Sequence, residues 1–148
     1  MVIHAYWDTS CVLKLYCEEK DSAGYLRRIA GSPDPVCSSV LLAAELAFAF
    51  HQKEHRGEIR EGASTILYEK FLGDVDSGRF LLIPMGDDVR KEARRIAGVC
   101  YGVDPPILLR TLDGLHLASA TLAGCREILT TDDRMQKATR LLGKTVGD

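Results

Sequence analysis

The sequence predicts an α/β fold in which a mainly parallel sheet of four to five strands is covered by helices on both faces. Short apolar runs alternate along the chain with longer segments whose apolar residues recur at helical spacing. Turn or capping residues stand at many of the borders between them. Such alternation is typical of parallel sheets. The chain has 148 residues, 46% of them hydrophobic, which suits one domain, 1–148, with one substantial core.

The strands are predicted from the apolar runs. Four runs are expected to pair in the sheet: Val2–Trp7, Val36–Ser38, Phe80–Ile83 and Glu127–Thr130. A short fifth strand can form over residues Lys144–Val146.

The helices are predicted from apolar residues at helical spacing and from their capping residues. Seven segments are expected: Ser10 to about Glu18, Ser22–Ala30, Leu41–Lys53, Glu58 to about Val75, Asp87 to about Tyr101, the segment after Thr111 that Gly124 ends, and Asp133 to Leu142. Asp87 can cap the fifth of these, and Gly143 can close the last. The segment Leu41–Lys53 is so apolar that we expect it to be buried.

Composition excludes several classes of protein. The formal net charge of −2 argues against a protein that coats long stretches of nucleic acid, although a local basic patch remains compatible with it. No apolar run approaches the roughly 20 residues of a membrane span, and the first residues lack the pattern of a signal peptide. The odd number of cysteines, without a CxxC pair, predicts reduced and mostly buried thiols. We therefore expect a soluble, cytoplasmic protein with no membrane partner.

Two acidic residues follow predicted strands directly. Asp8 comes after the first strand, and Asp132 stands in the same relation to the strand Glu127–Thr130. Ligands of parallel sheets bind at the carboxyl ends of the strands, where the strand order reverses. Each aspartate alone is equally well explained as a helix cap.

Two further acids lie in predicted helices. Glu45 sits within the apolar segment that begins at Leu41, where a lone charge is costly to bury unless it is paired or binds a metal. Pairing with Arg94 or Arg110 would be a structural explanation. Asp113 lies in the first turn of its helix, where the helix dipole alone would favour it.

Taken together, the four acids predict a site for hard divalent cations. Carboxylate ligands without cysteine or histidine suit Mg²⁺ or Mn²⁺ and do not suit zinc. Two such ions about 3.5–4 Å apart can activate a water and stabilise an in-line displacement at phosphorus. Ser10 and Thr130 can orient the acids by hydrogen bonds, or serve only as cap and turn residues.

Four segments, in order and spacing, resemble the motifs of PIN domains, especially VapC-type toxins of toxin–antitoxin systems. They are Tyr6–Tyr16, Ser38–Leu46, Leu112–Ala120 and Leu129–Met135. The resemblance spans nearly the whole chain. It implies a three-layer α/β/α sandwich and a ribonuclease that depends on Mg²⁺ or Mn²⁺. It also implies a homodimer and inhibition by a small cognate antitoxin.

The resemblance makes Asp8, Glu45, Asp113 and Asp132 the metal ligands and catalytic acids, with Ser10 and Thr130 in support. The fourth motif contains a possible alternative acid, Asp133, next to Asp132. The register Thr130-any-Asp, together with the position at a strand end, favours Asp132.

Two other residues near the motifs have both a functional and a structural interpretation. His116 follows Asp113 by one helical turn and is a possible catalytic base, but a histidine among leucines is more often a packed residue with one bonded nitrogen. Lys14 can approach a phosphate from the first helix or equally be a solvated lysine.

Two rival functions remain open at this point. One is a catalytically weak PIN-like module that binds metal or RNA and acts by occlusion. The other is a phosphohydrolase of the haloacid-dehalogenase kind, which also begins with an aspartate after the first strand. That chemistry needs a second aspartate two residues later, where this chain has Ser10.

Overall fold

A five-stranded parallel sheet forms the centre of the protein, as a computed structural model of residues 3–147 shows. The strands are β1 (Ala5–Trp7), β2 (Val36–Ser39), β3 (Phe80–Ile83), β4 (Glu127–Leu129) and β5 (Thr145–Val146). Their order is β3-β2-β1-β4-β5, and all neighbouring pairs are parallel. The predicted parallel sheet is confirmed, and so is its short fifth strand.

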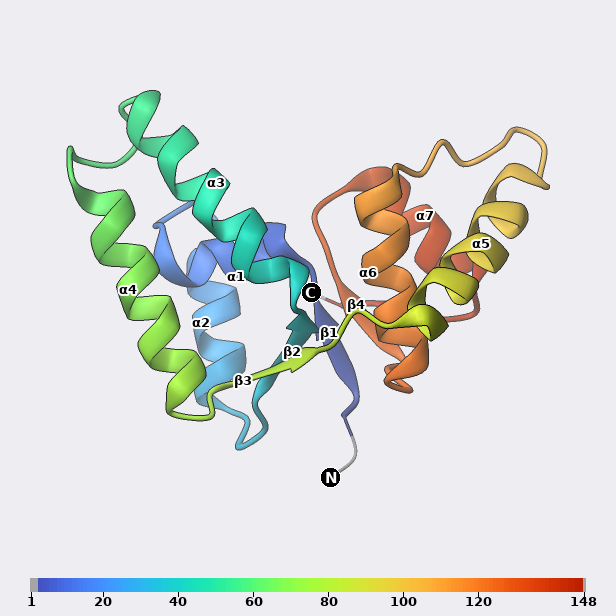
Figure 1. Cartoon of the computed structure of the whole chain (residues 1–148), viewed down its shortest axis with the longest axis horizontal. Helices are drawn as coiled ribbons and strands as arrows, with labels where there is room; N and C mark the ends of the chain where they lie inside the picture. The colour runs from blue at the N-terminus through green and yellow to red at the C-terminus, as the bar shows by residue number, and fades with distance from the viewer. Residues whose placement is uncertain (1–2, 148) are drawn as a thin grey trace.

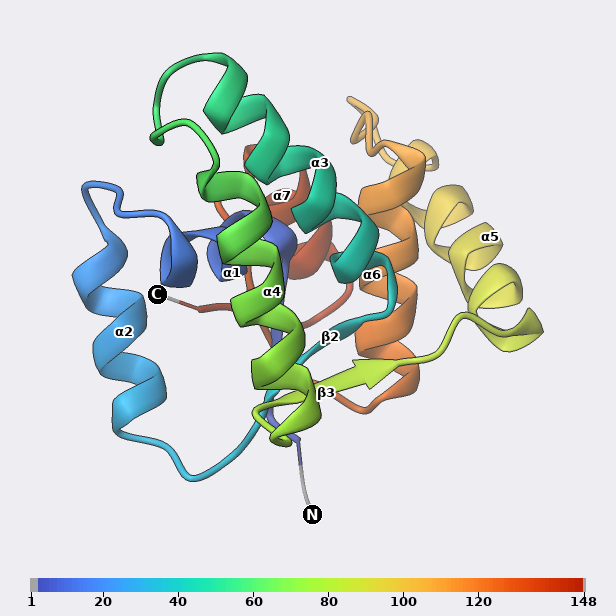
Figure 2. The same ribbon diagram turned by 60° about the vertical axis from the view of Figure 1, so that its left-hand side comes forward.

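Helices cover both faces of the sheet (Figure 1). Those in residues 3–147 are α1 (Thr9–Tyr16), α2 (Ser22–Ala30), α3 (Leu41–His55), α4 (Ala63–Asp76), α5 (Asp87–Tyr101), α6 (Thr111–Leu122) and α7 (Asp133–Leu141). Helices α1 to α4 lie on one side and α5 to α7 on the other, an arrangement that the turned view in Figure 2 also shows. The chain is therefore the α/β/α sandwich that the sequence predicts.

Several element boundaries differ from the prediction, most of them by one or two residues. The first strand begins at Ala5, and Val2 lies outside the described residues. The helix expected from Glu58 begins at Ala63, because Gly57 and Gly62 have φ angles of 74° and 83° and form a turn instead. The last predicted strand residue, Thr130, follows β4, which ends at Leu129.

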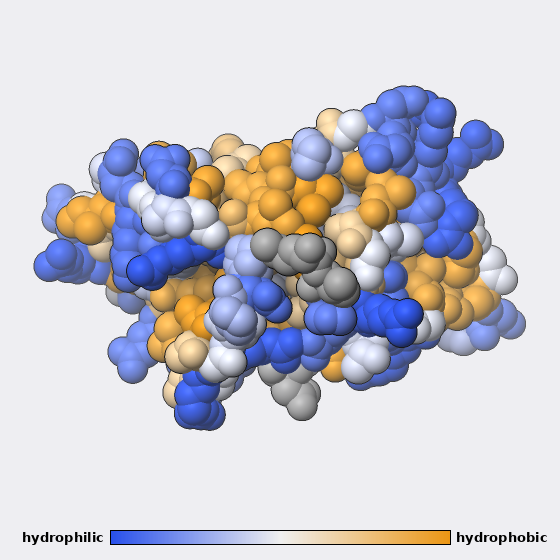
Figure 3. Space-filling model, turned by 90° about the horizontal axis from the view of Figure 1, so that it is seen from below, coloured by the Kyte–Doolittle hydropathy of each residue, from blue (hydrophilic) through white to orange (hydrophobic). Residues whose placement is uncertain are grey.

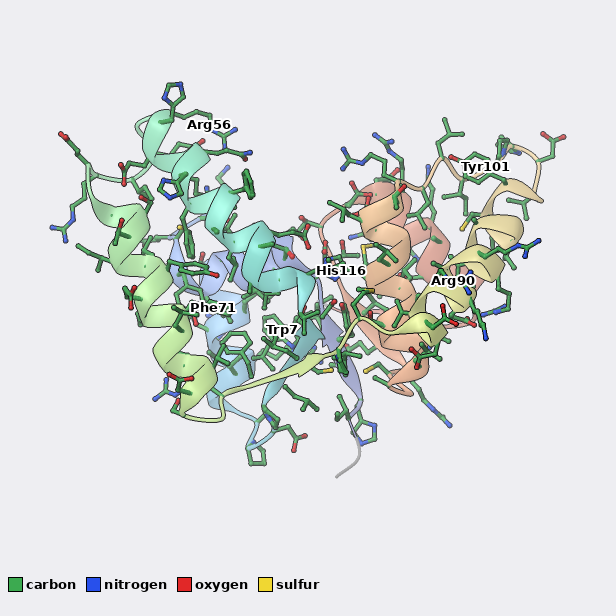
Figure 4. The ribbon with its side chains drawn as sticks, in the orientation of Figure 1. Trp7, Arg56, Phe71, Arg90, Tyr101 and His116 are labelled. Carbon is green, nitrogen blue, oxygen red and sulfur yellow. The ribbon has the colours of Figure 1, made fainter. Side chains whose placement is uncertain are left out.

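Two hydrophobic cores lie on the opposite faces of the sheet. Neighbouring strand residues alternate between them: Tyr6 and Ile128 pack in the core that includes residues of α5, α6 and α7, whereas Trp7 and Leu129 pack in the core that includes residues of α1, α3 and α4. Figure 4 shows Trp7 and Phe71 on the α4 side of the sheet. The inner strands β1, β2 and β4 are largely buried on both faces, which explains their continuous apolar runs, whereas the edge strands β3 and β5 are only partly buried.

The cysteines follow the prediction of buried thiols. All are free and buried: Cys11, Cys17, Cys37, Cys100 and Cys125. Between residues 3 and 147, no helix is both long enough and apolar enough to pass through a lipid bilayer.

Helix α3 offers a direct test of how the core stabilises the fold. Phe50 is 0% exposed and Phe48 is 72% exposed, two residues away on the same helix. We expect Phe50→Ala to lower the free energy of unfolding by about 3–5 kcal/mol, because it opens a cavity in the core. The matched Phe48→Ala variant should change it by no more than about 0.5 kcal/mol. Urea denaturation measures both, and equal losses would contradict the placement of α3.

Candidate functional site

The switch point of the sheet lies between β1 and β4. From β1 the chain passes outward to β2 and β3 on one side, and β4 and β5 lie on the other side. Asp8 follows β1, and Thr130 and Asp132 follow β4, so both segments reach the same edge of the sheet. Their backbones are joined there, since the amide of Asp8 donates to the carbonyl of Leu129 at 2.9 Å. This is where an open parallel sheet binds its ligands.

Asp8 is held by hydrogen bonds from both segments. It is 6% exposed and precedes α1 as the helix cap, accepting from the Thr9 amide at 2.8 Å through Oδ1. Its Oδ2 accepts from the hydroxyls of Ser10 and Thr130, each at 2.9 Å. Asp8 therefore caps α1, and Ser10 and Thr130 both donate to it, whereas the roles of these residues in a metal site stay a prediction. Three donors fix the orientation of this carboxylate.

Glu45 projects from α3 and is partly buried. Its Oε1 accepts from the Thr9 hydroxyl at 2.9 Å and is also hydrogen-bonded to Nε2 of His116. Glu45 is not paired with Arg94 or Arg110, so the structural explanation by such an ion pair is wrong. Burial alone would raise the pKa of Glu45, but the hydrogen bond and charge of His116, together with the Thr9 hydroxyl, outweigh burial and lower the pKa below its usual value.

His116 differs from the prediction. It was expected to be a packed residue with one bonded nitrogen, and it is fully buried, but both of its ring nitrogens are engaged. The second contact is between Nδ1 and the hydroxyl of Tyr6, at 2.6 Å. No feature of the sequence indicated the hydrogen bonds that Tyr6 and Thr9 form here. Only the one-turn spacing between Asp113 and His116 hinted that the histidine faces the acids.

Asp113 lies in the first turn of α6, where the sequence placed it. Burial raises its pKa, and the charges of Asp8 and Asp132 raise it further, against the weaker opposing charges of Arg110 and His116. The Arg110 contact is long, 3.6 Å from Nε to Oδ2, and the arginine side chain is mostly exposed. The three aspartates are therefore close enough to repel one another.

The structure separates the two adjacent acids of the fourth motif. Asp132 caps α7 by accepting from the Met135 amide at 2.9 Å, and its own amide donates to the Thr130 hydroxyl. Asp133 is 77% exposed and pairs with Lys137 at 3.1 Å on the outer surface of α7. Only Asp132 contributes to the pocket wall.

The four acids line one open pocket with a cavity volume of about 660 Å³. Apolar and polar residues of α3 and α6 complete its wall, among them Phe48, Gln52 and Leu112. Lys14 is not part of it, because its Nζ is bonded to Asp21 at 2.7 Å beside the turn between α1 and α2. Lys14 is therefore neither a pocket residue nor the solvated lysine of the alternative interpretation, because it is 9% exposed and ion-paired with Asp21.

The pocket provides the donor chemistry for a hard cation. The side chains around it supply oxygen ligands and repel one another as charges, which a divalent cation would relieve. As the acids stand, no group of three or more His, Cys, Asp or Glu side chains between residues 3 and 147 is gathered tightly enough to hold an ion. The residues fit Mg²⁺ or Mn²⁺ by their chemistry, and binding requires the carboxylates to draw together.

The opposite edge of the sheet lacks this concentration of acids. Figure 3 looks onto that side, where apolar surface gathers near the middle of the molecule and hydrophilic residues flank it. A pocket at the amino ends of β1 and β2 has Asp34 as its acidic residue and Arg28 as its basic one. Arg28 is ion-paired with Glu127. Of the pockets at the two edges of the sheet, the one at the carboxyl ends of the strands is therefore the one lined by four acids.

A parallel α/β/α sandwich with four acids around its switch point defines the class of protein. The PIN-domain family model matches residues 5–141, and the chain belongs to this family. Among curated proteins, the ribonuclease VapC46 of Mycobacterium tuberculosis (strain ATCC 25618 / H37Rv) is 33% identical over 143 residues, which are 95% of this chain and 94% of that protein. The expected family is confirmed, and the chain is a nuclease.

The two adjacent aspartates provide a test of the site. We expect Asp132→Asn to lower nuclease activity by at least about a hundredfold, because changes to residues that only orient metal ligands already cost 10- to 100-fold. The neighbouring Asp133→Asn variant should stay within about twofold of the wild type, since Asp133 faces away from the pocket. Initial rates with one RNA substrate compare the two. Loss of activity in Asp133→Asn alone would reverse the assignment.

Proposed function

We propose that this nuclease is a divalent-metal-dependent endoribonuclease and the toxin of a type II toxin–antitoxin pair. The observation that carries the proposal is the placement of Asp8, Glu45, Asp113 and Asp132 around one open pocket at the switch point. The name of the relative, a ribonuclease of the VapC type, supports RNA as the substrate.

The proposed mechanism uses Mg²⁺ or Mn²⁺ held by these four acids. The bound ions supply a water of lowered pKa and charge that stabilises the attacking and leaving oxygens of the phosphodiester. The protein's own residues orient the ligands: Ser10 and Thr130 hold Asp8, and Thr9 holds Glu45. No nucleophilic side chain is required, which agrees with Ser10 being a donor to Asp8. That role of Ser10 also argues against the haloacid-dehalogenase reaction, which needs a carboxyl group there.

The same proposal concerns both the compartment in which the protein acts and its protein partners. The cytoplasm is the compartment in which free thiols and an RNA substrate are expected together. Exposed apolar side chains at the pocket, Phe48 at 72% and Leu112 at 48%, support contact with a protein partner beside the site. We propose a small cognate antitoxin as one such partner and a second copy of the chain as another.

Cleavage of total RNA by purified protein is the principal test. We expect cleavage by the wild type with Mn²⁺, no cleavage with EDTA, and at least about a hundredfold loss in Asp8→Asn. Gel analysis of the fragments and sequencing of their ends measure the activity and its target. Cleavage by both proteins would sink the assignment of Asp8. Metal binding by a wild type that leaves RNA intact would favour the module that binds without cutting.

Metal binding can be tested separately by thermal unfolding. At Mn²⁺ concentrations about 100 times the dissociation constant, the folded state should gain about 2.7 kcal/mol, a rise in Tm of roughly 5–10 °C. EDTA should abolish the rise. Asp8→Asn should also show little of it, whereas Asp133→Asn should retain it in full. A rise of the same size in Asp8→Asn would place the ion elsewhere.

A further inference from the structure

A buried polar pair lies behind the pocket and contributes nothing to its wall. Tyr6 of β1 and His116 of α6 are each 0% exposed. Their rings pack edge to face with centroids 5.8 Å apart, and the Tyr6 hydroxyl lies 2.6 Å from Nδ1 of His116. Figure 4 shows His116 near the middle of the molecule, between its two groups of helices. Burying a phenol and an imidazole here needs a reason beyond filling the core.

His116 of this pair is also hydrogen-bonded to Glu45, one of the four acids of the pocket. Nε2 of His116 is hydrogen-bonded to Oε1 of Glu45, and the Thr9 hydroxyl donates to the same oxygen at 2.9 Å. The hydrogen bonds found within residues 3–147 leave the other oxygen, Oε2, unbonded. Glu45 itself lines the pocket, so one of its oxygens is held by the protein and the other is available to a ligand.

The direction of these hydrogen bonds follows from the groups involved. An ionised carboxylate can only accept, so Nε2 of His116 must carry the proton that faces Glu45. The Tyr6 hydroxyl keeps its proton, because burial raises its pKa far above the physiological range. It can donate to Nδ1 of a neutral ring or accept from Nδ1–H of a charged one. In both forms Nε2 donates to Glu45.

We propose that Tyr6 and His116 are positioning residues for Glu45, which hold Oε1 and leave Oε2 to the divalent cation. This inference rests on the proposed function, because it takes Glu45 to be a metal ligand. The arrangement links three elements, β1, α6 and α3, through side chains alone. Groups that orient metal ligands in this way usually set the affinity for the ion.

The test is the affinity for Mn²⁺ alone, measured by calorimetry without RNA. His116→Phe fills the space but has no donor, and we expect it to weaken binding by about a hundredfold. Tyr6→Phe removes only the hydroxyl and should weaken binding by about tenfold. His116→Gln offers an amide donor to Glu45, so its affinity should lie between those of the wild type and His116→Phe. Affinities within twofold of the wild type in both phenylalanine variants would overturn the inference.

Tyr16→Phe is the matched control. Its hydroxyl donates to Asp74 at 2.6 Å in the other half of the molecule, so this variant also loses one partly buried tyrosine hydrogen bond. It should bind Mn²⁺ as the wild type does. An equal loss of affinity in Tyr16→Phe would show that general destabilisation explains the result, and would also overturn the inference.

A measurement on the wild type covers the case in which the variants do not fold. Nitrogen-15 NMR of the imidazole reports which ring nitrogens carry protons. We expect Nε2 of His116 to be protonated, and an unprotonated Nε2 would overturn the inference. If the wild type binds no Mn²⁺, the metal-dependent function fails, whereas the NMR result still decides whether His116 donates to Glu45.

Discussion

The position of one carboxylate links the elements on which the site depends. Asp8 follows β1, caps α1, and is joined to the end of β4 and the residue after it through the carbonyl of Leu129 and the hydroxyl of Thr130. The central strand, its following helix and the strand across the switch point therefore meet at a single residue. Within residues 3–147, no lysine or arginine is paired with this carboxylate. Its charge is stabilised by the several hydrogen bonds that it accepts while nearly buried.

The other acids reach the same place from separate layers. Glu45 comes from α3 on one face of the sheet, and Asp113 comes from α6 on the other. Each helix is anchored in a different hydrophobic core, for example through Leu46 and Leu117. Packing of both faces is thus needed to set the separation between the acids. The contact between His116 and Glu45 is a direct polar link between these layers.

Much of this arrangement could be predicted from local pattern. The inner strands read as apolar runs because both of their faces are largely buried, and the positions of Asp8 and Asp132 followed from the geometry of parallel strands. The register of the strand end also favoured Asp132 over Asp133 as a pocket residue, and only Asp132 lines the pocket. The turn at Gly57 and Gly62 was not, because the surrounding residues kept a helical pattern.

What the sequence did not indicate are contacts between residues far apart in the chain. Tyr6 and His116 are separated by 110 positions, and His116 and Glu45 by 71. No sequence pattern marks contacts over such long separations. The sequence around a buried histidine among leucines is the same whether the histidine is hydrogen-bonded to a backbone carbonyl or to an acid of the pocket. Only the packing of α6 against the sheet makes the distinction.

The strand order also has a consequence for how this protein is made. The acids are distributed from residue 8 to residue 132 of the chain, and β4, the strand that precedes the last of them, pairs with the first strand. A nascent chain that has not yet emerged as far as β4 has neither its fourth acid nor the partner strand that orients Asp8. Products that end before Asp132 therefore lack one of the four acids that line the pocket, and a ribosome translating this message is not exposed to the complete pocket until that residue has been added.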